Sequence, residues 1–323
     1  MTAARPTDVP TAPATLPAAS APRRRSPGGI ALTVLGVALA LAAVALGVLQ
    51  GLAWLFTQES SGSATLAATD VVEVVADGQV HVSAEAVQEV RVDREAQYAW
   101  SAPAYDVRSD GERTVVRHRC PAIAVRCSAD LSVTVPEGTR VVVRSGDGDV
   151  RVAGPSDAVT VRATDGDVHV SGTRGDVEVR GADGDVSVDD VRGAVLADVT
   201  DGALRVADVT GGVVVGTVDG RVDVLRVGGD VEARTTSGRL EVSDVRGALT
   251  ATSTDGDVLV AAVAGDVTAS TVDGDLTVHG NGEPVALTLD TAGRQRVEAP
   301  TDPDADVRVV LRAVDGAVAY LAP

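Results

Sequence analysis

The chain has 323 residues, a formal net charge of −18 and only 2% aromatic residues. This acidic surplus argues against nucleic acid as a partner, because phosphate binding requires a basic surface. The length allows one large domain or two small ones. The shortage of aromatic rings predicts a thin core filled by Val, Leu, Ala and Thr.

Residues 1–29 form a tail rich in Pro, Ala and Thr, with an arginine cluster at Arg23, Arg24 and Arg25 near its end. The tail has little apolar surface to bury, so we expect it to be disordered. The next segment, residues 30–56, contains no charged residue.

A helix over residues 30–56 would be about 40 Å long, and the hydrocarbon core of a bilayer is about 30 Å thick. A cleaved signal peptide is the alternative, but its apolar region is about 7–15 residues long. We therefore predict one transmembrane helix whose partner is the lipid bilayer of the cell membrane. The arginine cluster predicts a cytoplasmic N-terminus and an extracellular C-terminal domain.

Gly47 and Gly51 form a G-x-x-x-G pair inside this predicted span. Such a pair lets two helices approach closely, which makes it a candidate for homodimer formation. The alternative is that glycine is simply frequent in a segment rich in Ala and Gly.

Residues 57–65 are polar and rich in Ser, and we expect a linker there. Residues 66–144 show no regular period and predict an irregular N-terminal β cap. The strands expected in this cap are Val71–Val75, Val80–Val82, Val90–Val92, Thr114–His118, Leu131–Val135 and Arg140–Arg144.

Cys120 and Cys127 are the two cysteines of the chain. Outside the cytoplasm an even number of cysteines favours a disulfide. Free thiols and a metal site are the alternatives, although two Cys with His118 nearby are too few ligands for a metal.

Residues 145–283 carry a glycine at almost every ninth position, and an acidic or small residue and an apolar residue follow most of them. The apolar positions two and four residues after each glycine should point to the same side of a strand. A third inward position is expected seven residues after the glycine: Val191, Thr200, Val209, Val218, Val227, Thr236, Val245, Thr254, Val263 and Val272.

The deeper period is eighteen, because Asp, replaced once by Ser237, precedes every second glycine and mixed residues precede the others. This pattern predicts an all-β fold, a parallel β-solenoid with about 18 residues per coil. An antiparallel meander of hairpins is the alternative. Residues 284–323 break the rhythm and are expected to form a C-terminal β cap that covers the last coil.

The solenoid would place the repeated Asp residues in one file along one edge. Three readings stay open for this file: turn chemistry, Ca²⁺ binding, or recognition of a cationic or sugar partner. The candidate Ca²⁺ ligands are Asp147, Asp165, Asp183, Asp201, Asp219, Asp255 and Asp273.

The sequence resembles a bacterial domain-of-unknown-function family of β-strand repeat proteins that carries a provisional adhesin label. The resemblance covers roughly residues 70–320. It rests on the Cys120 and Cys127 pair, the run Leu131–Gly138 and repeats such as Thr164–Val168. It implies a surface module and supplies no catalytic residues. Some relatives are encoded with envelope-stress systems, which implies an accessory or sensor role as the alternative.

No catalytic or cofactor-binding motif occurs in the sequence, and its four histidines are spread along the chain. We therefore expect a protein that is not an enzyme and uses no cofactor, with Ca²⁺ as the one ion considered. The expected function is a membrane-anchored, extracellular binding or scaffold module. Its ligand would be a cell-wall component, a polysaccharide or a protein.

Overall fold

The computed structural model describes residues 27–55, 57–122 and 126–323. The chain divides into two compact units, Met1–Leu52 and Ala53–Pro323. Most of the tail predicted to be disordered therefore lies outside the described residues.

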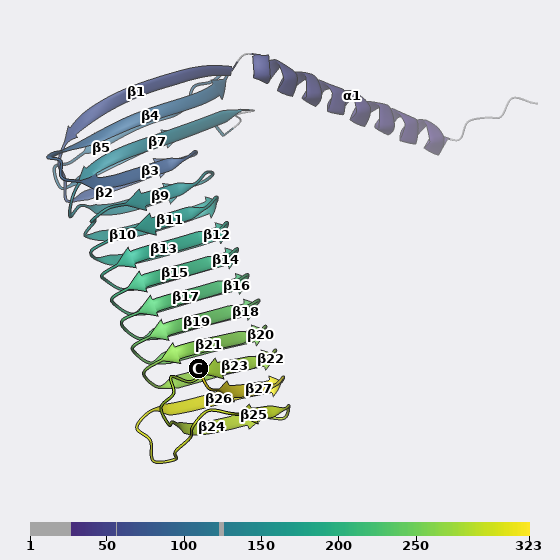
Figure 1. Cartoon of the computed structure of the whole chain (residues 1–323). Coiled ribbons are helices and arrows are strands. Elements are labelled where there is room, and N and C mark those ends of the chain that lie inside the picture. The colour runs from purple at the N-terminus through teal and green to yellow at the C-terminus, as the bar shows by residue number, and fades with distance from the viewer. Residues whose placement is uncertain (1–26, 56, 123–125) are drawn as a thin grey trace, which may run out of the picture. The chain divides into compact units, whose positions relative to one another are not determined.

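The N-terminal unit contains most of one long helix, α1 (Pro27–Leu55), which begins three residues before the predicted start (Figure 1). Among the described residues, no helix has the length and apolar character needed to cross a membrane. The predicted transmembrane span over residues 30–56 is therefore not confirmed. Gly47 and Gly51 lie in α1, with open space where a Cβ atom would point, and their role in dimer formation stays a prediction.

The second unit, here called the body, is built of strands (Figure 1). Its N-terminal strands are β1 (Thr57–Ala67), β2 (Val71–Ala76), β3 (Val80–Glu85), β4 (Glu89–Ala99), β5 (Ala104–Ser109), β6 (Arg113–Arg119) and β7 (Cys127–Pro136). The strands of the regular coils are β8 (Arg140–Ser145), β9 (Val150–Ala153), β10 (Ala158–Asp165), β11 (Val168–Ser171), β12 (Asp176–Asp183), β13 (Val186–Val191), β14 (Val195–Asp201), β15 (Leu204–Val209), β16 (Val213–Asp219), β17 (Val222–Val227), β18 (Val231–Ser237), β19 (Leu240–Val245), β20 (Leu249–Asp255), β21 (Val258–Val263), β22 (Val267–Asp273) and β23 (Leu276–His279). The C-terminal strands are β24 (Ala286–Thr291), β25 (Gln295–Val297), β26 (Arg308–Asp315) and β27 (Val318–Leu321).

Two facing sheets make up the body, one of 14 strands, called sheet A, and one of 13 strands, called sheet B. Each regular coil contributes one strand to each sheet, so β12 lies in sheet B and β13 in sheet A. Neighbouring strands are parallel and in register, as in the pairs Val177↔Val195 and Val186↔Leu204. The paired residues are 18 apart in sequence, which confirms the predicted parallel solenoid with an eighteen-residue coil.

The core lies between the two sheets and consists of stacked files of aliphatic side chains. One file runs through the regular coils and into the C-terminal coil, and each of its members is at most 2% exposed: Val150, Val168, Val186, Leu204, Val222, Leu240, Val258, Leu276 and Val318. Burying such a side chain contributes about 1.5–3 kcal/mol. Because every coil repeats the same positions, a narrow core of mostly Val and Leu, with Tyr320 buried at its C-terminal end, is stable along the whole stack.

The prediction of a third inward position seven residues after each glycine is wrong for sheet B. In sheet A, Val245 is buried at that position, but in sheet B Val218 and Val272 are 46% and 44% exposed. The inward residue in sheet B lies six residues after the glycine, as Thr217 and Thr271 do. The sequence period of two simply continues there.

A left-handed residue causes the different phase in sheet A. Asp190, Asp208, Arg226, Asp244 and Ala262, each six residues after a glycine, have φ between 52° and 56°. A residue in this conformation turns the chain out of the pleat, so the next side chain points inward again. Gly154 and Gly172 take the same position in earlier coils, also with positive φ.

The N-terminal segment is more regular than predicted, because it contributes complete coils. Strands β2 and β3 pair in parallel with β8 and β9 on one side and with β6 and β7 on the other. Strands β4 and β5 pair antiparallel with β7 and β6 at the end of the stack. Strands β4 and β5 separate β2 and β3 from β6 and β7 in the sequence, so the eighteen-residue period is not visible there.

The predicted polar linker over residues 57–65 is instead part of β1, which pairs antiparallel with β4 from Thr57↔Ala99 to Ala67↔Glu89. Its Ser and Gly residues are typical of flexible linkers. The free edge of β4 supplies backbone hydrogen-bond partners that local sequence does not reveal.

The C-terminal end has a matching arrangement. Strands β26 and β27 lie between β22 and β23 on one side and β24 and β25 on the other. The last coil in sequence is thus not the last coil in space. In the final strand pair in space, β25 has only three residues, which limits the exposed edge of sheet A.

Candidate binding surfaces

One edge of the solenoid, here called the Asp edge, contains the turns that lead from sheet B to sheet A. Its members stack in register from coil to coil: Asp165, Asp183, Asp201, Asp219, Ser237, Asp255, Asp273 and Asp315. The file predicted from the sequence is therefore real. Asp147 precedes it in the turn at Gly148.

Asp315 is an additional member that sequence reasoning missed. Its local sequence, Val314-Asp315-Gly316, repeats Val272-Asp273-Gly274, and this triplet could have revealed it. Asp315 stacks on Asp273 although the two are 42 residues apart in sequence instead of 18, and this longer spacing concealed it.

Glycine is required at these turns for two reasons. Gly184 has φ of 121°, and a Cβ atom there would lie 2.4 Å from the carbonyl oxygen of Gly166 in the neighbouring coil. A side chain would thus be strained by its own backbone and would also collide with the next coil.

The carboxylates before and after these glycines have different roles. Asp185 follows Gly184, and its Oδ1 accepts a hydrogen bond of 2.8 Å from the backbone N–H of Ala203, one coil away. Asp167 and Asp275 accept equivalent bonds. In the part of the chain that the structure describes, no hydrogen bond or ion pair engages the carboxylates of the Asp edge. The Asp residue that stabilises the turn by hydrogen bonding is therefore the one after the glycine, and not the one before it.

The Ca²⁺ reading has no support from the geometry. Across the described residues, no three Asp, Glu, His or Cys side chains come together as a group that could hold a metal ion. The Asp edge presents exposed carboxylates in single file, whereas Ca²⁺ takes six to eight oxygen ligands.

The opposite edge carries mixed charges around the left-handed residues. A hollow of about 620 Å³ is lined there by Asp208, Arg226, Asp244, Arg246 and small residues. Arg226 donates to both oxygens of Asp208, at 2.6 and 2.7 Å. This hydrogen bonding lowers the pKa of the Asp208 carboxyl and raises the pKa of Arg226. Both groups are exposed, so the pair orders the edge locally and contributes little to stability.

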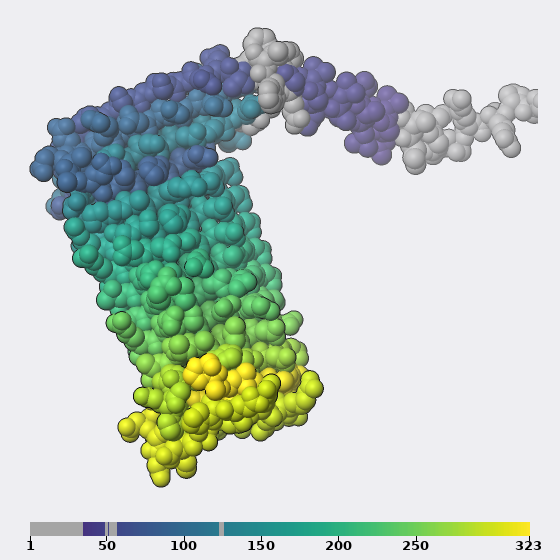
Figure 2. All heavy atoms as spheres, viewed as in Figure 1, coloured from purple at the N-terminus to yellow at the C-terminus, as the bar shows by residue number. Residues whose placement is uncertain are grey.

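The outer face of sheet B carries adjacent apolar side chains in its middle coils. Leu196 and Val214 are stacked there, and Thr250 stacks on Thr268 farther along. A groove of about 710 Å³ crosses six coils of this face, and its centre is lined by Ala194, Leu196, Gly212 and Val214. On the face drawn in Figure 2, the coils form a shallowly ridged surface without a deep hollow.

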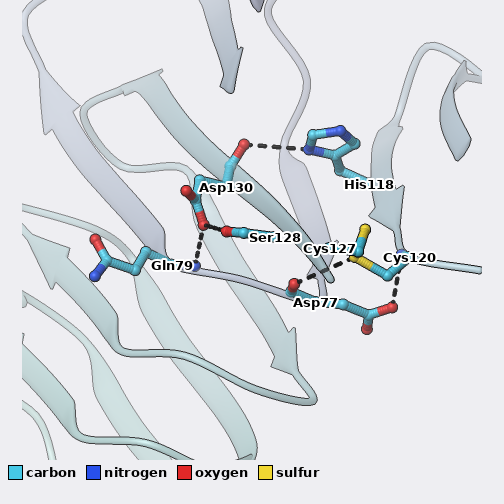
Figure 3. The surroundings of a disulfide bond; sticks show 7 residues. All are labelled: Asp77, Gln79, His118, Cys120, Cys127, Ser128 and Asp130. Carbon is cyan, nitrogen blue, oxygen red and sulfur yellow. Dashed lines mark hydrogen bonds between the residues drawn. A yellow bond between two sulfur atoms is a disulfide. The ribbon is translucent and has the colours of Figure 1, made fainter. Parts of the chain in front are cut away.

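The cysteines form a disulfide, Cys120–Cys127, with Cα atoms 5.9 Å apart. It joins the end of β6 to the start of β7 and so closes the turn of one N-terminal coil (Figure 3). Asp77 accepts a hydrogen bond of 3.0 Å from the Cys120 N–H. The cysteines are therefore structural and not available as metal ligands.

Asp130, beside the disulfide, performs the same task as Asp185 (Figure 3). Its Oδ1 accepts hydrogen bonds from the Gln79 N–H at 2.8 Å and from the Ser128 hydroxyl at 2.7 Å. His118 lies next to it, 1% exposed, with Nδ1 3.2 Å from the Asp130 carbonyl oxygen. Burial lowers the pKa of His118, so the ring is held neutral in the core.

Comparison with known proteins agrees with this architecture. The model of the Toastrack DUF4097 family matches residues 112–318. No curated protein matches the chain.

Among solved structures, one similar chain is described as a cell adhesion protein from Clostridium sporogenes, with 10% identity and a TM-score of 0.27, over 82% of this chain and 100% of that chain. Another is described as an adhesin from Bacteroides fragilis, with 10% identity and a TM-score of 0.33, over 82% of this chain and 97% of that chain. The family match alone spans well over half of the sequence. The chain therefore belongs to the Toastrack DUF4097 family.

Proposed function

We propose that the body is a non-catalytic surface-binding module, displayed outside a bacterial cell and attached to its membrane through residues 30–56. The groove on the outer face of sheet B is the observation that carries this proposal. Six successive coils line it, and its centre is formed by Leu196 and Val214 with the small residues Ala194 and Gly212.

The shape of the groove suits an extended ligand better than a small substrate. Small-molecule sites are usually concave and bury most of the ligand. This groove instead runs along the stack, and its lining residues are held by strands paired in register. Such a rigid face places a changing set of side chains, from Glu178 through Leu196 to Glu232, at regular spacing along a polysaccharide chain or an extended protein segment.

The non-catalytic part of the proposal is supported by the origin of the displaced pKa values. Burial raises the pKa of Tyr105 and Tyr320 and lowers that of His118. Asp208 has its exposed arginine partner. Each displacement has a packing or ion-pair cause, whereas catalytic sites gather such groups in one cleft.

Membrane attachment rests on the sequence: 27 uncharged residues follow an arginine cluster. A test is fractionation of cells that express the full chain and a chain lacking residues 30–56. The full chain should sediment with membranes after a high-salt wash, and protease added to intact cells should digest its body. Recovery of the full chain in the wash would contradict the attachment.

The binding proposal is tested by a pull-down with residues 57–323 on purified cell wall, polysaccharide and surface-protein fractions, with and without Ca²⁺. Leu196→Asp should abolish capture, because a charge enters the centre of the groove. Leu225→Asp is the matched control, since Leu225 points outward from sheet A. No capture by any fraction, together with a deletion phenotype only under envelope stress, would favour the accessory or sensor role instead.

A further inference from the structure

An arginine pocket lies on the outer face of sheet B at its N-terminal end. Strands β5, β6, β2 and β8 are neighbours there, in that order. They bring together four arginines that line a pocket of about 560 Å³: Arg108, Arg113, Arg117 and Arg144. The rest of the lining is Glu73, Ser109, Asp110 and Val115.

Glu73, in the centre of β2, is the anion around which the pocket is built. Its side chain is 3% exposed and forms ion pairs with Arg113 on β6 and Arg144 on β8. A buried carboxylate requires such partners, because its desolvation is costly. The pairs hold both guanidinium groups at the floor of the pocket.

The remaining charges leave a positive surplus. Arg108 pairs with Asp106 at 2.9 Å, but these side chains are 74% and 46% exposed, so the pair is weak. Asp110 accepts hydrogen bonds from the backbone N–H groups of Glu112 and Arg113. Within the described residues, the half-buried Arg117 has no carboxylate or other side-chain partner. Asp106 also lies directly opposite Arg117 in the pairing of β5 with β6. Four arginines thus meet three carboxylates, a surplus of one positive charge on a chain whose net charge is −18.

We propose that this pocket binds a phosphate group, with Arg117 as its main ligand and Arg108 as a second. Guanidinium groups pair with phosphate oxygens through two parallel hydrogen bonds. Arginines on three different strands line this one pocket, so several guanidinium groups can engage the oxygens of a single tetrahedral anion. The inference extends the proposed binding function by naming one ligand chemistry and a site separate from the groove.

Isothermal titration of the full chain in a non-ionic detergent with inorganic phosphate tests this site. Saturable binding is expected, and Arg117→Gln should weaken it about tenfold, the equivalent of one lost charged hydrogen bond. Arg117→Lys should recover part of the affinity, because it keeps the charge but loses the fork. Arg192→Gln, an exposed arginine outside the pocket, is the control and should bind as the parent does.

Glu73→Gln gives a test of opposite sign. It removes the internal anion and frees Arg113 and Arg144, so phosphate should bind more tightly. Circular dichroism melting of each variant shows whether the fold is retained. No saturable binding by the parent chain, or an equal loss in Arg117→Gln and Arg192→Gln, would overturn the proposal.

A second arm identifies the source of the phosphate. Mixed micelles of the same detergent with phosphatidylglycerol or with phosphatidylcholine replace the inorganic ion. If lipid in the micelles competes with inorganic phosphate for the parent chain, and Arg117→Gln abolishes this competition, the pocket binds a lipid headgroup. If inorganic phosphate binds normally and the lipid does not compete with it, the pocket binds a soluble phosphate. Capture of envelope fractions by a chain that fails both arms would refute this pocket and leave the groove proposal intact.

Discussion

The two halves of each coil have the same length but differ in the backbone conformation of their turns. Both contain nine residues, one strand and one turn with a glycine. In the half that enters sheet A, the glycine has positive φ, as Gly220 does at 148°, and a second left-handed residue follows six positions later. In the other half, Gly211 and its equivalents have no positive φ, and the strand keeps its alternation to the end. Equal spacing in a repeat thus does not imply equal conformation.

The largest expected difference in stability is at the position seven residues after the glycine in the two halves of a coil. Val245 and Thr254 each lie seven residues after a glycine, but Val245 is 1% exposed and Thr254 is exposed. Val245→Asp should lower the free energy of unfolding by about 4 kcal/mol, because it buries an unpaired charge. Thr254→Asp should change it by less than about 0.5 kcal/mol. Urea unfolding followed by circular dichroism measures both, and similar losses would mean that the halves share one phase.

The glycines of the two halves should also differ in how much stability is lost on substitution by Ala. At Gly220 a Cβ atom would lie 2.0 Å from the Gly202 oxygen, and at Gly211 it would lie 2.4 Å from the Gly193 oxygen. Both Ala variants are crowded, but only Gly220→Ala also forces Ala into positive φ. We expect a loss of about 3 kcal/mol for Gly220→Ala, and a loss smaller by about 1 kcal/mol for Gly211→Ala. Thermal melting of the two variants side by side would reveal a reversed order.

A smaller effect separates the two carboxylates of one turn. Asp185→Ala removes the acceptor for the Ala203 N–H and should cost about 1–2 kcal/mol. Asp183→Ala, two residues earlier, removes an exposed carboxylate of the Asp edge and should change stability by less than about 0.5 kcal/mol. Equal losses in chemical denaturation would show that the Asp edge is also structural.

The smallest effect has the opposite sign. Ala262 has φ of 52°, a conformation that costs Ala about 1–2 kcal/mol and Gly nothing. After the entropy cost of glycine, Ala262→Gly should raise stability by about 0.5 kcal/mol. Ala264→Gly, two residues later and without positive φ, should lower it by about the same amount. Melting temperatures that fall in both variants would remove the left-handed residue as the cause of the phase difference.

The regular part of the fold was predictable because residues close together in the sequence determine it. The glycine period, the paired Val positions and the Asp file follow from residues within one coil of each other. The left-handed position was not predictable, because Arg226 and Ala262 are not residues that favour positive φ. Only Asp190, Asp208 and Asp244 hint at it, and Asp is frequent throughout the chain.

The ends and the surface sites depend on pairing that the sequence does not show. Strand β1 resembles a linker until β4 provides its partner. The arginine pocket joins Arg108 and Arg117 to Arg144 only because β2 lies between β6 and β8. Leu196 and Val214 take outward positions in the strand alternation, but the groove around them requires the small residues of neighbouring coils.

The placement of β26 and β27 between two other coils has a mechanical consequence. A tension applied at the C-terminus cannot peel off a terminal coil, because the pulled strands have a neighbour on each side. It must break both strand interfaces together before any repeat yields. At the other end the strands begin with β1, which is the outermost strand of sheet A. The stack is therefore fastened in this way at its C-terminal end, and coils of 18 residues could be gained or lost before it without loosening that fastening.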